Sequence, residues 1–131
     1  MVKKVLVFAV ISAASAVVLG AFAAHGLEGK LSADQLSTFQ TGVRYQFIHA
    51  LAILGLGAIG MNQKDLNLMP PYRLFEFGTY LFSLSLYLLS TRHLMNADWI
   101  EHLAYLTPIG GLCFVGGWLV FLFKIVLKIR D

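Results

Sequence analysis

Side chains able to bind a small ligand or to pass a proton concentrate in two short stretches of the sequence. The first, "HGLE", spans 25–28, and the second, "RYQFIH", spans 44–49. Together they offer imidazole, carboxylate, guanidinium, phenol and amide groups, which suit a proton or ion step or a small polar ligand. The candidate polar cluster therefore consists of His25, Glu28, Arg44, Tyr45, Gln46 and His49.

The spacing of the second stretch limits which of these side chains can meet. On a helix, Tyr45 and His49 are four residues apart and share a face. Arg44 precedes His49 by five residues, an offset of about 140°, so the two do not pair along the helix. Each is expected to face a neighbouring helix, or Arg44 extends outward to lipid headgroups.

No metal, cofactor or catalytic site is predicted. Helical metal motifs usually place two ligands three or four residues apart, and no two of the four histidines have that spacing. A glycine-rich phosphate loop, a Ser–His–Asp signature and a nucleophile elbow are also missing from the sequence. Cys113, the single cysteine, lies in an apolar run and is interpreted as a packing residue. The chain is therefore not expected to be an enzyme.

The composition places the chain in a membrane. Apolar residues make up 58 % and charged residues 13 %, whereas soluble proteins carry roughly 25 % charged residues. The net charge of +3 comes without a basic stripe, so nucleic acid is not expected as a partner. A spanning helix needs about 20 mostly apolar residues, and four such segments are predicted at 5–24, 44–61, 72–90 and 104–124. We expect one all-α domain over 1–131, a bundle of four transmembrane helices.

Local signals set the ends of these helices. "LSADQL" predicts a capping box between Ser32 and Gln35, so helix two begins with an amphipathic segment ahead of its apolar part. Pro71 is predicted at the start of helix three. For helix four, Thr107 is a possible cap, with Pro108 just inside; alternatively that helix starts earlier and bends at Pro108. The first segment also resembles a signal peptide with a cleavage site at 21–23, but its long apolar run favours retention as a span.

Small residues recur where helices would approach each other closely. They fall every four residues on helix one and in pairs on helix four, the pattern of membrane helix association. A tight bundle or a homo-oligomer would use these faces: Ser12, Ala16, Gly20, Gly110, Gly111, Gly116 and Gly117.

The distribution of lysine and arginine predicts the orientation. With four spans, seven basic residues share the side that holds both termini: Lys3, Lys4, Lys64, Arg73, Lys124, Lys128 and Arg130. The other side holds Lys30, Arg44 and Arg92. Because cytoplasmic loops are enriched in lysine and arginine, both termini are expected in the cytoplasm.

Several motifs resemble a known family. "GAFAAHGL" at Gly20–Leu27, "TGVRYQFIHALA" at Thr41–Ala52 and "TPIGG" at Thr107–Gly111, with Gly117-Trp118, are similar to a small bacterial membrane family, domain of unknown function 423. A small mitochondrial transmembrane protein of animals is similar too. This chain departs from the pattern at Ala23 and Leu84, where glycine is usual. The resemblance implies a four-span inner-membrane protein without an established activity. Its motif positions include Gly20, His25, Gly26, Arg44, Tyr45, Gln46 and His49.

Two functions remain open at this point. The first is a structural or interaction protein of the inner membrane that contacts lipid and associates with itself or with another membrane protein. In that case Arg44 anchors the interface and His49 makes a hydrogen bond between helices. The second is a protein that handles a small solute, an ion or a proton at the polar cluster. Glu76 is predicted to form only a local ion pair with Arg73.

Overall fold

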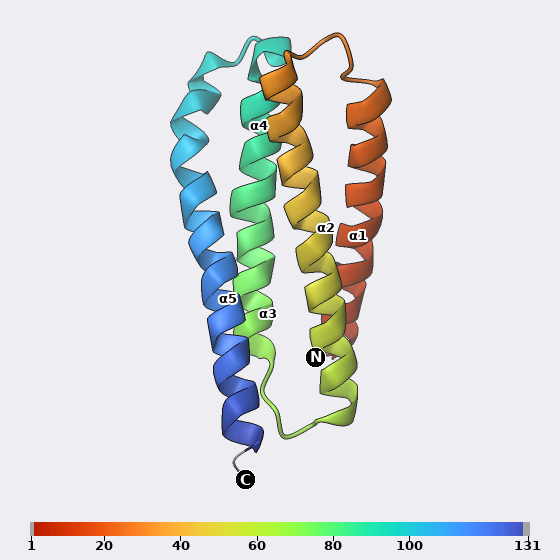
Figure 1. Ribbon diagram of the computed structural model, residues 1–131, viewed down its shortest axis with the longest axis vertical. Coiled ribbons are helices and arrows are strands. Elements are labelled where there is room, and N and C mark those ends of the chain that lie inside the picture. Colours follow the sequence, from red (N-terminus) through yellow and green to blue (C-terminus); the bar gives the residue numbers. More distant parts are fainter. Residues whose placement is uncertain (1, 130–131) are drawn as a thin grey trace.

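The computed structural model describes residues 2–129, and its elements form four long helical rods (Figure 1). The first two rods are α1 (Val2–His25) and α2 (Ala33–Asn62). The third combines α3 (Met69–Gly78), the π-helical η1 (Thr79–Leu84) and α4 (Ser85–Thr91). After the 3₁₀ turns η2 (Arg92–Met95) and η3 (Asp98–Tyr105), α5 (Leu106–Ile129) forms the fourth. The described residues contain no strand, which confirms the all-α prediction. Arg130, part of the charge count above, lies outside them.

Successive rods run in opposite directions, so α1 and the third rod point the same way (Figure 1). Among residues 2–129, three segments are long and apolar enough to cross a membrane: Val2–His25, Ala33–Asn62 and Asp98–Lys128. The third rod is not among them as a single helix, because the wider π-helical turns of η1 divide it into shorter elements.

The predicted start of α2 is confirmed. The Gln35 backbone N–H donates to Ser32 Oγ at 3.2 Å, and the Ser32 backbone N–H donates to Gln35 Oε1 at 2.9 Å. This reciprocal pair satisfies two backbone donors that the first turn would otherwise leave unpaired. The amphipathic segment that follows turns its apolar face inward, where Phe39 packs with Ala23 and Tyr87.

The two proline signals had different outcomes. Pro71 does lie in the first turn of α3, as predicted. Of the two alternatives for the fourth rod, the cap at Thr107 is wrong and the earlier start is confirmed: the helical path begins at Asp98 as η3 and continues into α5 at Leu106. Pro108 lies in the first turn of α5, where a missing N–H removes little hydrogen bonding. The 3₁₀ turns of η3 can therefore precede it without a break in the rod. The Thr107 hydroxyl instead lies 2.7 Å from Ser85 Oγ on the third rod.

The small residues are used inside the chain. Ser12 and Ala16 are buried in the contact between α1 and α2, and a Cβ added at Gly20 would lie 3.4 Å from Val43. On α5, a Cβ at Gly110 would meet the backbone nitrogen of Phe82 at 2.4 Å, and one at Gly117 would meet the Phe75 ring at 2.5 Å. Gly111 and Gly116 have nothing closer than 3.8 Å. These faces therefore build two tight pairs, α1 with α2 and α5 with the third rod.

Candidate functional site

The six predicted site residues do not come together in one cluster. His25 at the end of α1 and Glu28 in the following turn are exposed, and within residues 2–129 neither forms a side-chain hydrogen bond or ion pair with the other four. Arg44 is exposed beside α1, where it lines an apolar hollow with Gly20 and Phe47. Only Gln46 and His49 are buried, and each forms a separate polar centre.

Gln46 joins three helices. Its amide nitrogen donates to the Ser12 backbone carbonyl at 2.9 Å and to Ser15 Oγ at 2.8 Å, both on α1. Its amide oxygen accepts from the Tyr87 hydroxyl of α4 at 2.7 Å. Both ends of the carboxamide are therefore engaged, and a single side chain of α2 links α1 to the third rod.

His49 joins α2 to α5. Its Nδ1 lies 2.8 Å from the carbonyl oxygen of Tyr45, and because a carbonyl only accepts, Nδ1 carries the hydrogen. Nε2 then accepts from the indole N–H of Trp118 at 3.3 Å. The imidazole also stacks on Phe114, with ring centroids 3.5 Å apart and planes 9° apart. Both nitrogens are engaged in a neutral ring, which suits a link between helices rather than a free acid or base.

Tyr45 belongs to the aromatic surroundings of His49 and not to the Gln46 centre. Its ring centroid lies 4.7 Å from that of Phe82 and 6.1 Å from that of His49. At 39 % exposure it forms the outer edge of this aromatic group. The prediction that Tyr45 and His49 share a helix face is thus confirmed. The Tyr45 ring contributes aromatic packing around His49.

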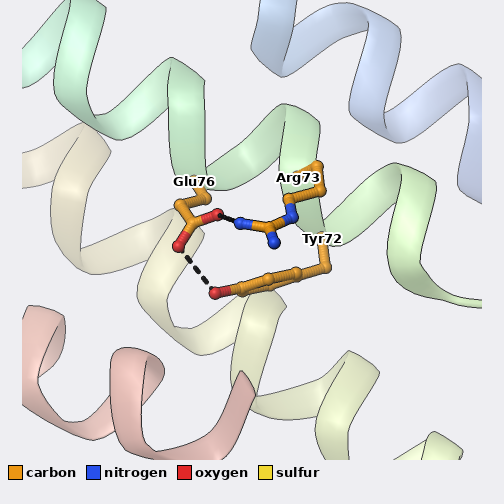
Figure 2. Close-up of polar contacts among 3 residues, drawn as sticks. All are labelled: Tyr72, Arg73 and Glu76. Atoms are coloured by element: carbon orange, nitrogen blue, oxygen red, sulfur yellow. Dashed lines mark hydrogen bonds and ion pairs between the residues drawn. The ribbon is translucent and has the colours of Figure 1, made fainter. Parts of the chain in front are cut away.

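A third polar centre lies at the start of α3 (Figure 2). Arg73 and Glu76 form the predicted ion pair, with NH1 and Oε2 2.7 Å apart. Glu76 Oε1 accepts from the Tyr72 hydroxyl at 2.7 Å, so both carboxylate oxygens are engaged. The Arg73 guanidinium lies 5.6 Å from the centre of the Tyr72 ring. The carboxylate is thereby neutralised locally, while the arginine side chain remains 57 % exposed.

Two loose ion pairs lie at the opposite end of the bundle. His93 Nδ1 lies 3.7 Å from Asp98 Oδ1, and Arg92 NH2 lies 4.0 Å from Glu101 Oε2. Within residues 2–129, no group of three or more histidine, cysteine or acidic side chains could hold a metal ion. Exposed pairs of this kind contribute little to stability.

Sequence reasoning did not assign Ser15, Tyr87 and Trp118 to the polar centres. The signal for Tyr87 was a phenol in an otherwise apolar segment, because a buried Tyr hydroxyl usually finds a partner. Two buried hydroxyls, Ser12 Oγ and Ser83 Oγ, have no hydrogen-bond partner in the described structure.

Comparisons with known proteins agree on one family. A family model described as "Protein of unknown function (DUF423)" matches residues 19–111. The chain is 40 % identical over 120 residues to the UPF0382 inner membrane protein YgdD of Escherichia coli strain K12, which covers 92 % of this chain and 87 % of that protein. It is 38 % identical over 118 residues to the UPF0382 membrane protein SSP2132 of Staphylococcus saprophyticus, covering 90 % and 92 % respectively. No solved structure matches.

Proposed function

This chain belongs to the DUF423 family of membrane proteins, and we propose that it is a four-span protein of the inner (plasma) membrane that acts as a structural or interaction protein. Both termini lie in the cytoplasm in this proposal, and the chain has no catalytic centre. Its partners are membrane lipid and a second copy of the chain or another membrane protein.

The observation that supports the proposal is that Gln46 and His49, the two buried members of the predicted cluster, form hydrogen bonds across helices. Gln46 connects α2 to α1 and α4, and His49 connects α2 to α5. In lipid such bonds replace contacts with water that are not available there. Handling of a solute or proton would require free polar groups, and both nitrogens of His49 are already engaged.

Helix lengths support the fourth span. At about 1.5 Å per residue, the third rod from 69 to 91 is about 34 Å long, enough for a hydrocarbon core of about 30 Å. Its charged residues, Arg73 and Glu76, lie near its start. Arg44 lines the same hollow as Gly20 of α1, so the two residues lie at a similar depth. Gly20 is about 24 Å along α1 from Lys4. That places Arg44 near the far side of the same core, within reach of headgroups for a long side chain.

Labelling of single cysteines tests this topology. In a Cys113→Ser background, we introduce cysteine at Lys30, in the turn after α1, at Lys64, in the turn after α2, or at His93, in η2 after the third rod. A maleimide that does not cross membranes should label positions 30 and 93 from outside intact cells and label position 64 only after permeabilisation. Protection of position 93 together with position 64, or equal labelling of all three positions in intact cells, would contradict the proposed four-span arrangement.

Self-association requires a separate test, since the small-residue faces are occupied within the chain. Copies would then meet through the outer faces of the bundle, where Val18 of α1, Leu51 of α2 and Leu119 of α5 are exposed. We expect oxidative cross-linking of single cysteines at these three positions, again without Cys113, to be confined to one face. Cross-linking at none of them, or equally weak cross-linking at all three, would indicate a monomer and direct attention to another membrane protein as partner.

A further inference from the structure

A groove runs along α1 on the side that faces the third rod. Near the N-terminal end it is a hollow of about 580 Å³ lined by Lys4, Phe8, Tyr72 and Arg73. Farther along it is a hollow of about 610 Å³ between α1 and η1–α4. Phe8 and Ile11 line both hollows, so the two hollows lie next to each other along α1, on either side of the Phe8 contact with the third rod, and together they make up the groove.

The groove exists because α1 packs along α2 and makes little close backbone contact with any other helix. Aromatic side chains bridge α1 and the third rod instead. The Phe8 ring meets Tyr72 edge-on at a centroid distance of 6.1 Å and Tyr80 edge-on at 5.8 Å. Bulky rings hold the two rods apart and leave space on either side of the contact.

The N-terminal end of the groove carries positive charge that the protein does not neutralise. Lys4 is exposed, and within residues 2–129 it has no carboxylate within 4.0 Å. One nitrogen of Arg73 donates a hydrogen bond to Glu76 (Figure 2), while a guanidinium has five N–H donors in all. Lys4 and Arg73 carry two positive charges at this end, and Glu76 carries one negative charge. Both Glu76 oxygens already have partners, Tyr72 and Arg73, so the positive charge of Lys4 stays without a counter-charge.

Beyond this end the exposed wall is mainly apolar, although hydroxyl and amide side chains also line the second hollow: Ser12, Ser15, Gln46, Thr79, Tyr80 and Tyr87. Ile11 and Leu84 contribute aliphatic side chains within the depth of one lipid leaflet, while Leu19 lies about 22 Å from Lys4 along α1, beyond the midplane. From Lys4 to Ser15 the groove follows α1 for about 16 Å, and half of a hydrocarbon core is about 15 Å. The third rod runs in the same direction as α1 (Figure 1). Arg73 lines the same hollow as Lys4, and Leu84 lines the same hollow as Ser15. A cationic end at the interface followed by a mainly apolar channel to the midplane matches a headgroup phosphate and its acyl chains.

We propose that this groove is a binding site for an anionic phospholipid of the cytoplasmic leaflet. Lys4 and Arg73 bind the phosphate, and Ile11 and Leu84 contact an acyl chain. Anionic lipids are the source of the negative potential of that leaflet. The inference rests on the proposed four-span insertion, because it needs Lys4 and Arg73 at one membrane surface.

Native mass spectrometry of the full-length protein in detergent tests the site. The parent is mixed with phosphatidylglycerol or with phosphatidylcholine carrying the same acyl chains. Lys4→Gln removes one groove cation, and its matched control is Lys3→Gln, an exposed neighbour that does not line the groove. Ile11→Trp fills the groove, and its control is Val10→Trp, equally exposed but outside it. Thermal melting without added lipid verifies that each variant is folded.

Phosphatidylglycerol should bind the parent more tightly than phosphatidylcholine. A basic residue near a charged lipid surface contributes about 1 kcal/mol, so Lys4→Gln should weaken phosphatidylglycerol binding about fivefold, and Lys3→Gln should not. Ile11→Trp should weaken binding of both lipids, unlike Val10→Trp. Equal losses in the two lysine variants, or equal binding of the two lipids by the parent, would overturn the proposal. If the cysteine labelling still supports four spans in that case, only the lipid site fails.

Discussion

The contact between Gly110 of α5 and the backbone of η1 gives the sharpest prediction. A Cβ at position 110 would lie 2.4 Å from Phe82 N and 2.8 Å from Leu81 C. Favourable contacts between heavy atoms are near 3.5–4.0 Å, and backbone atoms cannot move aside by rotamer changes. Gly110→Ala should therefore push α5 away by about 1 Å, at a cost of about 1–3 kcal/mol or more. The better helix propensity of alanine offsets at most about 1 kcal/mol.

The neighbouring glycine is the matched control. A Cβ at position 111 has its nearest neighbour, a Phe82 ring carbon, at 3.8 Å, which is an ordinary contact. Gly111→Ala should therefore be neutral or stabilising by up to about 1 kcal/mol. Unfolding of both variants by increasing sodium dodecyl sulfate in mixed micelles gives the two free energies of unfolding. If Gly110→Ala is as stable as Gly111→Ala, the close approach of α5 to η1 is wrong.

The polar centres and the cap yield three further predictions for the same assay. Gln46→Leu removes three hydrogen bonds between helices, each about 0.6 kcal/mol in membranes, and strands a buried Tyr hydroxyl. We expect a loss of about 2–4 kcal/mol, whereas Gln40→Leu, at an exposed position, should cost little. Trp118→Phe keeps a ring but leaves Nε2 of His49 without its donor, so it should cost about 1 kcal/mol and shift the imidazole nitrogen resonances in NMR; unchanged resonances would contradict the bond. Ser32→Ala should cost about 1 kcal/mol through loss of the N-cap, and no loss would mean that the capping box is not formed in the membrane.

The features predicted correctly are those in which all partners are close in the sequence. The Ser32–Gln35 capping box and the Arg73–Glu76 ion pair each join residues three apart. Helix geometry alone brings such pairs together. The apolar runs likewise place the four rods, since length and hydropathy are properties of each segment by itself.

The polar cluster could not be predicted because it depends on how each helix is rotated about its axis. Gln46 bonds to Tyr87, which lies 41 residues away, and His49 bonds to Trp118, 69 residues away. Residues 44 and 46 differ by about 200° around a helix, so one side chain faces outward when the other is buried. Sequence proximity had grouped Arg44 with Gln46, and the fold separates them.

Whether a polar side chain has a hydrogen-bond partner within the protein indicates whether it could bind something outside the chain. Inside the bundle, the carboxamide of Gln46 and the ring of His49 have partners on other helices, so changing them should first alter stability. Lys4 and Arg73, by contrast, keep donors directed to the surroundings at the end of an apolar groove. A charge kept near lipid without a full partner is costly unless something in the membrane compensates it. We therefore expect ligand binding at the groove between α1 and the third rod. The buried centres of Gln46 and His49 fix the positions of the helices that form this groove.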